Sequence, residues 1–201
     1  MFFSKTKAPP KESLQEKAGQ LLVTPTALAD LSAIDAQIVV GYMLPQRLLQ
    51  GTVFITEGEV AHTDFMMLII DGEVMVQNEA AHENDGTVMS VIGPGSMIGE
   101  MGLLDGEPRS ATCTATTDLT VAILPRDALL KLIKAKPAVA ARLMLAISKR
   151  LSDRLREANR KIKTLDGLSR ALSQELDVAH AAALKPLTPV SGKPLAKRQS
   201  I

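Results

Sequence analysis

The chain has 201 residues and 46% hydrophobic residues, enough to bury one core with appendages but not two full domains. Aromatic residues make up only 2% and Trp is absent, so the core must consist mainly of aliphatic side chains and Met. The single cysteine, Cys113, excludes an internal disulfide and a multi-cysteine metal cluster, and we expect a cytoplasmic location.

The net charge of +1 conceals a division of charge along the chain. Residues 1–125 hold six Lys and Arg against sixteen Asp and Glu, whereas residues 126–201 hold seventeen against six. The simpler interpretation is an acidic domain with a basic helix partly docked on it. The alternative is a basic surface for nucleic acid or anionic lipid, and charge alone leaves both open.

The N-terminal region begins with Lys and Pro and lacks a sustained apolar period, so we expect residues 1–26 to form a flexible arm. It has no apolar stretch of signal-peptide length, and no other segment is an uncharged run long enough to span a bilayer. Residues 27–49 then place apolar side chains at helical spacing, which predicts one short helix or two. Asp30 or Ser32 is the expected cap.

From residue 51 to residue 124 the apolar period shortens towards two, which is typical of strands. Five apolar or alternating runs carry this pattern: 53–55, 65–70, 74–76, 88–92 and 119–124. Glycine-rich turn signals separate them, and Asp71-Gly72 between two apolar runs is a strong hairpin signal. The expected fold class is α+β, with a double-stranded β-helix (a jelly-roll-like β roll) over residues 27–135, flanked by N-terminal helices and a long C-terminal helix.

The C-terminal part has helical composition, and we predict a long helix over residues 136–182, broken from the preceding segment at Pro137 and loosened at Gly167. Its apolar residues alternate four and three apart, with Ser169 as the polar exception: Leu151, Leu155, Ala158, Ile162, Leu165, Leu172 and Leu176. This stripe either packs on the roll or forms a two-stranded seam, and the length of the helix favours a parallel homodimer seam. Residues 183–201 hold three prolines, four cations and no acid, and we expect a disordered basic tail.

Arg109 is the one cation between Arg47 and Arg126, against twelve carboxylates. It closes a segment that begins with a glycine turn and has Glu100 in the expected first turn of a short helix, where backbone N–H groups favour an anion. Gly99 and Gly102 remove side chains where a ligand must approach the backbone, and a guanidinium offers a phosphate two parallel hydrogen bonds. By spacing alone, an ordinary ion pair between Glu100 and Arg109 is the alternative.

The order of this segment resembles the phosphate-binding cassette of the cyclic nucleotide-binding domain family, which reads Gly-Glu-Leu-(Ala/Gly)-Leu and then Pro-Arg-(Ala/Ser/Thr)-Ala-Thr. This chain has Gly99-Glu100-Met101-Gly102-Leu103-Leu104 and, three residues later, Pro108-Arg109-Ser110-Ala111-Thr112. Upstream marks of the family also occur: Gly51, Phe54, the Glu57-Gly58-Glu59 turn and the segment 69–74. The resemblance covers about residues 28–165.

The resemblance implies that Arg109 binds the exocyclic oxygens of a cyclic phosphate and that Glu100 binds the ribose 2′-hydroxyl. Leu103 occupies the hinge position of the family and would couple the site to the C-terminal helix. The main-chain groups that would complete the site are those of Gly99, Met101, Gly102 and Ala111. Met101 replaces the usual Leu, a swap that conserves volume.

The choice of base depends on two further residues. Ser110 is similar to the serine found at this place in bacterial cAMP-binding regulators of the family, so the resemblance favours cAMP, with cGMP as the second candidate ligand. Arg154 and Leu155 align with a polar pair through which bacterial regulators of the family contact adenine, and this chain departs from that pattern. Arg154 either stacks on or bonds to the purine or is a solvated surface arginine. The expected nucleotide-binding residues are therefore Gly99, Glu100, Met101, Gly102, Arg109, Ser110, Ala111 and Arg154.

Other functional classes have little support. Bacterial transcription regulators of this superfamily carry a winged helix-turn-helix after the long helix, and with only about twenty residues after Ala182 we expect no sequence-specific DNA binding. Salt-sensitive phosphate contacts by the basic helix stay open. The three histidines lack metal-ligand spacing, a Walker loop is absent and Cys113 fits a core position, so we expect no metal, cofactor or enzymatic activity.

The sequence therefore predicts a non-enzymatic cAMP sensor that signals to an unidentified protein effector through its C-terminal helix. Two alternatives remain. One is a scaffold of the same fold that binds no ligand and uses a basic coiled coil to bind protein or nucleic acid. The other is a receptor for cyclic di-GMP.

Overall fold

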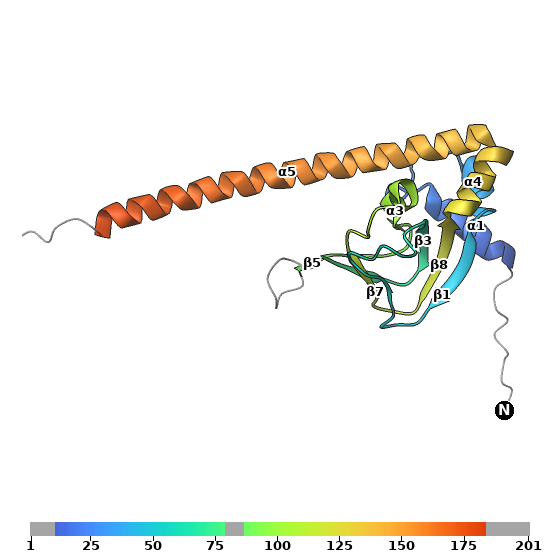
Figure 1. Cartoon of the computed structure of the whole chain (residues 1–201), viewed down its shortest axis with the longest axis horizontal. Helices are drawn as coiled ribbons and strands as arrows, with labels where there is room; N and C mark the ends of the chain where they lie inside the picture. Colours follow the sequence, from blue (N-terminus) through green and yellow to red (C-terminus); the bar gives the residue numbers. More distant parts are fainter. Residues whose placement is uncertain (1–10, 79–86, 184–201) are drawn as a thin grey trace, which may run out of the picture. The chain divides into compact units, whose positions relative to one another are not determined.

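The structure is a computed structural model that describes residues 11–78 and 87–183. It divides into two compact units, Met1–Asp153 and Arg154–Ile201. The first unit holds the strands and the helices around them, and the second holds the remainder of the last helix (Figure 1). The expected long helix is present as α5 (Pro137–Ala183), which begins at a proline and runs through Gly167 without interruption.

In the described residues, two helices precede the strands and two follow them. The first pair is α1 (Lys11–Leu22) and α2 (Ala33–Val40); the second is α4 (Arg126–Ala135) and α5, with Lys136 as the single residue between them. The remaining elements are β1 (Leu44–Leu48), β2 (Val53–Ile55), β3 (Phe65–Asp71), β4 (Val74–Asn78), β5 (Thr87–Ile92), β6 (Met97–Ile98), α3 (Glu100–Asp105), β7 (Thr112–Ala115) and β8 (Leu119–Pro125).

The strands form two four-stranded antiparallel sheets, in the orders β1-β8-β3-β6 and β2-β7-β4-β5. This is the expected β roll with flanking helices, so the predicted fold class is confirmed. The Asp71-Gly72 hairpin prediction is wrong, because β3 and β4 are consecutive in the chain but belong to different sheets. Gly72 turns the chain between the sheets at φ 89°, where an added Cβ would lie 2.4 Å from the carbonyl oxygen of Asp118.

The prediction of a flexible arm over residues 1–26 is wrong for the part that forms α1. Leu14, Ala18 and Leu22 recur every four residues, and the last two are fully buried against the helices and the first sheet. One apolar residue per turn is only a weak sign of a helix in the sequence. In the structure these side chains pack into the core, which stabilises the helix. Residues 1–10 of the expected arm lie outside the described residues.

The helix expected over residues 27–49 is confirmed only for α2, with Ser32 as its cap: the Ser32 side chain accepts a hydrogen bond from the backbone N–H of Asp35. After Gly41 the chain forms β1, which pairs with β8 from Leu44↔Ile123 to Leu48↔Leu119. Pro45 explains the correction, because proline is excluded from a helix interior but tolerated in an edge strand such as β1.

The core lies on both faces of β3. Met66, Leu68 and Ile70 face a cluster built with the helices, whereas Met67 and Ile69 face the interior of the roll. Cys113 lies in the roll interior, and its burial raises the pKa of the thiol to about 11. The thiol therefore stays protonated at neutral pH and packs as a small apolar side chain, as the sequence predicted.

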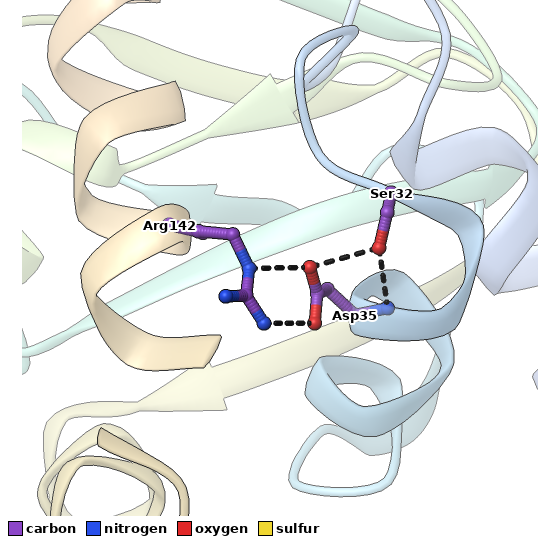
Figure 2. Close-up of polar contacts among 3 residues, drawn as sticks. All are labelled: Ser32, Asp35 and Arg142. Atoms are coloured by element: carbon purple, nitrogen blue, oxygen red, sulfur yellow. Dashed lines mark hydrogen bonds and ion pairs between the residues drawn. The ribbon is translucent and has the colours of Figure 1, made fainter. Parts of the chain in front are cut away.

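The first part of α5 is held by polar contacts to residues 26–35, which belong to the acidic part of the chain, residues 1–125. Arg142 binds the buried carboxylate of Asp35 through two hydrogen bonds, and the Ser32 hydroxyl donates a third (Figure 2). Lys149 pairs with Asp30 at 2.6 Å, and Arg150 donates to the carbonyl oxygen of Thr26. These contacts support the simpler interpretation of the charge division for this part of the helix.

The second unit presents the apolar stripe. From Leu155 to Leu176 its five Leu and Ile side chains are 60% to 66% exposed, whereas Leu151, the first predicted seam residue, packs against the core of the first unit. Within the described residues, no helix has the length and apolar character needed to cross a membrane. The predicted tail over residues 183–201 lies outside the described residues except for Ala183.

Candidate functional site

The short helix α3 is bracketed by two glycines in the left-handed conformation. Gly99 is its N-cap at φ 80° and Gly106 is its C-cap at φ 75°. Only glycine adopts this conformation at little cost, so the glycines set where α3 begins and ends. The expected short helix with Glu100 in its first turn is therefore present, at the end of β6.

Arg109 is buried beside the start of α3, with 6% of its surface exposed. Nη1 donates to the carbonyl oxygens of Gly99 and Phe65 at 3.3 Å, and Nη2 donates to those of His62 at 3.0 Å and Phe65 at 3.3 Å. The guanidinium also stacks on the Phe65 ring, with Cζ 4.3 Å from the ring centroid. Main-chain oxygens and an aromatic face thus hold a full positive charge in one place.

The two cassette glycines make room for this guanidinium. A Cβ added to Gly99 would lie 2.7 Å from Arg109 Nη1, and one added to Gly102 would lie 2.6 Å from the Thr63 carbonyl oxygen and 3.0 Å from Nη1. Sequence reasoning assigned this clearance to an approaching ligand. In the structure the arginine occupies the space, so the first role of both glycines is to admit Arg109.

Burial and the neighbouring carboxylates act in opposite directions on the pKa of Arg109. Burial lowers the pKa of Arg109, while Glu59, Asp64 and Glu100 act in the opposite direction. A guanidinium stays protonated under such opposing influences at neutral pH. Glu100 is itself 1% exposed, so the site combines a buried cation with a buried carboxylate at the start of α3.

The backbone of Arg109 is anchored by the Glu57-Gly58-Glu59 turn. The N–H of Arg109 donates to the Glu59 carbonyl at 3.0 Å, and the N–H of Gly58 donates to the Arg109 carbonyl at 2.8 Å. The sequence marked this turn but not the contributions of His62 and Phe65. Their main-chain carbonyls accept hydrogen bonds from Arg109, and main-chain groups leave no signal in the sequence. The Phe65 ring also contacts the guanidinium, but a single phenylalanine at the start of a strand does not indicate such a contact.

The structure brings four expected residues together at the start of α3: Gly99, Glu100, Gly102 and Arg109. Met101 is exposed on α3, and Ser110 and Ala111 follow Arg109 on the way into β7. Arg154 is an exposed residue of the second unit, and its place in the site stays a prediction. In the described part of the chain, no group of three His, Cys, Asp or Glu side chains is arranged to hold a metal ion.

Leu103 and Arg126 connect α3 with the helices that follow. Leu103 is 1% exposed and belongs to the same core cluster as Leu129 of α4 and Leu143 of α5. Arg126, the first residue of α4, donates hydrogen bonds to the carbonyl oxygens of Leu103 and Leu104. Sequence reasoning identified Leu103 from its cassette position but missed Arg126, because a cation after a strand is too common a pattern to mark a contact.

Comparison with known proteins agrees with this geometry. Residues 45–136 match the sequence model of the family described as cyclic nucleotide-binding domain. A CRP-like cAMP-activated global transcriptional regulator of Mycobacterium tuberculosis is 27% identical over 129 residues, which cover 64% of this chain and 53% of the regulator. A cAMP-dependent protein kinase regulatory subunit of Yarrowia lipolytica is 33% identical over 106 residues, which cover 53% of this chain and 27% of the subunit.

A solved structure leads to the same family. The crystal structure of a cyclic nucleotide-binding domain from Methylobacillus flagellatus has a TM-score of 0.62 and 29% identity, and the match covers 73% of this chain and 80% of that one. The chain spans about half the length of the mycobacterial regulator and less of the kinase subunit. The segment of residues 45–136, with its cassette between β6 and β7, belongs to the cyclic nucleotide-binding domain family.

Proposed function

We propose that this protein is a non-enzymatic cyclic nucleotide sensor with cAMP as its preferred ligand. The observation that carries the proposal is the buried guanidinium of Arg109, held at the start of α3 by main-chain carbonyl oxygens. A phosphate carries a charge opposite to that of the guanidinium and can accept two parallel hydrogen bonds from it, so it adds an ion-pair attraction that a neutral carbonyl oxygen lacks. Replacing carbonyl partners by a cyclic phosphate is therefore favourable for this guanidinium.

The other cassette residues have complementary roles in the proposal. Glu100 accepts a hydrogen bond from the ribose 2′-hydroxyl, which its buried carboxylate does best when ionised. Main-chain groups of Gly99, Met101, Gly102 and Ala111 surround the phosphate and ribose. The left-handed turn at Gly99 supports this arrangement, because it turns the backbone into α3 directly beside Arg109.

The preference for cAMP over cGMP rests on Ser110 and on the relatives. The mycobacterial regulator is named as cAMP-activated, and the Yarrowia lipolytica protein is named as a regulatory subunit of a cAMP-dependent protein kinase. Arg154 completes the proposed site as a contact to the purine. We assign the protein to the cytoplasm, in keeping with its single cysteine.

Signalling passes in the proposal from α3 through Leu103 to α4 and α5, and from there to a protein effector. The burial of Leu103 in one cluster with α4 and α5 supports this route. The ligand shifts the populations of two helix arrangements. It favours one arrangement only to the extent that it binds that arrangement more tightly.

The protein is proposed to act as a parallel homodimer through the exposed stripe of α5. In a parallel pair with Leu155, Ile162 and Leu176 in the seam, Lys161 of one helix lies opposite Asp166 of the other, and Glu175 lies opposite His180. The Lys161–Asp166 pair brings opposite charges together across the seam. The flanking charges thus support a parallel arrangement.

Isothermal titration calorimetry of the full chain with cAMP, cGMP and cyclic di-GMP tests the proposal. We expect cAMP to bind most tightly and Arg109→Ala to abolish binding while the fold persists. A response to cyclic di-GMP alone would identify a dinucleotide receptor, and no response to any nucleotide would leave a scaffold. A thermal-shift panel gives an independent reading, because a ligand that binds only the native state raises the melting temperature.

A further inference from the structure

The C-terminal end of α3 is completed by a side chain from another element. The last carbonyl groups of a helix lack intrahelical partners. In α3 the Gly102 carbonyl accepts the N–H of Gly106 at 3.0 Å. The next two carbonyls are both bound by Arg126: Nε donates to Leu103 at 3.1 Å, and Nη2 donates to Leu103 and Leu104 at 2.9 Å. One guanidinium, partly buried, closes the end of this helix.

The position of Arg126 suits its charge. The carbonyl end of a helix carries partial negative charge, which a cation stabilises. The guanidinium lies beside the C-cap, since a Cβ added to Gly106 would be 3.9 Å from Arg126 Nη2. The Gly106 carbonyl in turn accepts a hydrogen bond from the hydroxyl of Thr63 at 3.3 Å. The carbonyl groups from Gly102 to Leu104 and that of Gly106 therefore all have hydrogen-bond partners.

The backbone of Arg126 is attached to the same stretch of chain that holds Arg109. Its N–H donates to the Asp64 carbonyl at 2.8 Å. The next residue, Phe65, provides the carbonyl and the ring that hold Arg109, and it pairs with Pro125 in the sheet. Arg109 therefore binds the beginning of α3 through Gly99, and Arg126 binds its end through Leu103 and Leu104. Both arginines also bind carbonyl oxygens at the start of β3, those of Phe65 and Asp64.

We propose that Arg126 is a positioning residue for nucleotide binding. It holds α3 so that the first turn, with Gly99 and Glu100, is in place for the ligand, and it transmits movement of α3 to α4 without touching the nucleotide. Because Arg126 is the first residue of α4, any shift of the end of α3 acts directly on the start of that helix. This assignment rests on the proposed nucleotide-binding function and adds a residue outside the cassette to it.

The test compares Arg126→Ala, Arg126→Lys and a control, Arg142→Ala, in the full chain. We expect Arg126→Ala to bind cAMP about tenfold or more weakly by calorimetry, because hydrogen bonds from a charged group are lost. Arg126→Lys should recover part of the affinity. A lysine ammonium can bind one of the two carbonyl oxygens, but it lacks the planar guanidinium that binds Leu103 and Leu104 together. Arg142→Ala also removes a guanidinium with two hydrogen bonds, but these go to Asp35 and not to α3. It should lower the melting temperature and leave the affinity unchanged.

Amide hydrogen exchange of the nucleotide-free protein provides the second readout. Exchange over residues 100–106 should accelerate in Arg126→Ala and stay unchanged in Arg142→Ala. Wild-type affinity in Arg126→Ala, or an equal loss of affinity in both variants, would overturn the assignment. If Arg126→Ala does not fold, Arg126→Lys and Arg126→Gln serve in its place.

The two proposals fail in different ways. If the wild-type chain binds no nucleotide, the proposed function fails, whereas the exchange experiment still decides whether Arg126 holds α3. If the wild type binds cAMP and Arg109→Ala does not, while Arg126→Ala binds normally, only the role of Arg126 fails.

Discussion

Arg142 of α5 and Asp35 of α2, 107 residues apart in the chain, face each other with two parallel hydrogen bonds: Nε to Oδ2 at 2.7 Å and Nη2 to Oδ1 at 2.8 Å (Figure 2). The carboxylate is 6% exposed and the arginine 53%. Ser32, which caps α2, also donates its hydroxyl to Asp35. One carboxylate therefore joins the cap of a helix in the acidic part of the chain to the start of the basic helix.

This contact predicts a loss of stability in acid. The hydrogen bond from Arg142, followed by that from Ser32, lowers the pKa of Asp35 below its ordinary value of 3.8. Since the folded pKa is lower than the unfolded one, the stabilisation is complete above the unfolded pKa and is lost as pH falls through the folded pKa. The melting temperature of Asp35→Asn should be lower than that of the wild type at pH 7, and the gap should narrow below about pH 4. A gap that stays constant from pH 7 to pH 3 would contradict this assignment.

Gly99→Ala should damage the site far more than a glycine substitution at the same backbone angle elsewhere. Gly99 and Gly51 both have φ 80°, but an added Cβ meets Arg109 Nη1 at 2.7 Å in the first case and nothing within 4 Å in the second. Each substitution costs roughly 1–2 kcal/mol for the left-handed conformation. Only Gly99→Ala also displaces the guanidinium, so it should abolish cAMP binding, while Gly51→Ala should retain it. Equal affinities in calorimetry would show that Arg109 does not need this clearance.

Glu100 should decide whether the protein distinguishes cAMP from 2′-deoxy-cAMP. A hydrogen bond to a charged group contributes about 1.5–3 kcal/mol, so the wild type should prefer cAMP by about tenfold or more. In Glu100→Ala the preference should disappear, because the acceptor of the ribose hydroxyl is gone. Competition binding with both nucleotides measures this directly. Arg126→Lys is a suitable control, since it changes α3 from its other end and should keep the preference. A preference that persists in Glu100→Ala would remove Glu100 from the ribose contact.

The apolar stripe of α5 should determine the oligomeric state. Ile162 is 62% exposed and lies in the proposed seam, where an aspartate would place a charge between two helices. Ile162→Asp should therefore convert a dimer into a monomer in analytical ultracentrifugation. Thr164→Asp, two residues away on the outward face, adds the same charge and should leave the dimer intact. A wild-type protein that sediments as a monomer would refute the seam.

The sequence was sufficient where the signal is local. Strands β2 to β5 and β8 were predicted from their apolar runs, and the break at Pro137 from the chemistry of proline. The cassette from Gly99 to Arg109 was identifiable because its glycines and charged residues stand in a compact order. In each case the physical cause lies within a few residues of its effect.

Tertiary contacts decided the remainder. A weak apolar period became the buried helix α1 because the core covers Ala18 and Leu22, and Leu44–Leu48 became an edge strand because β8 offers a partner. The same distinction between local signals and tertiary contacts applies to the residues around Arg109. The sequence by itself determined which residues form the cassette, since their identity and order are its signature. Only the folded chain decided what holds Arg109 and the end of α3, because main-chain carbonyls and the contact from Arg126 come from segments distant in sequence.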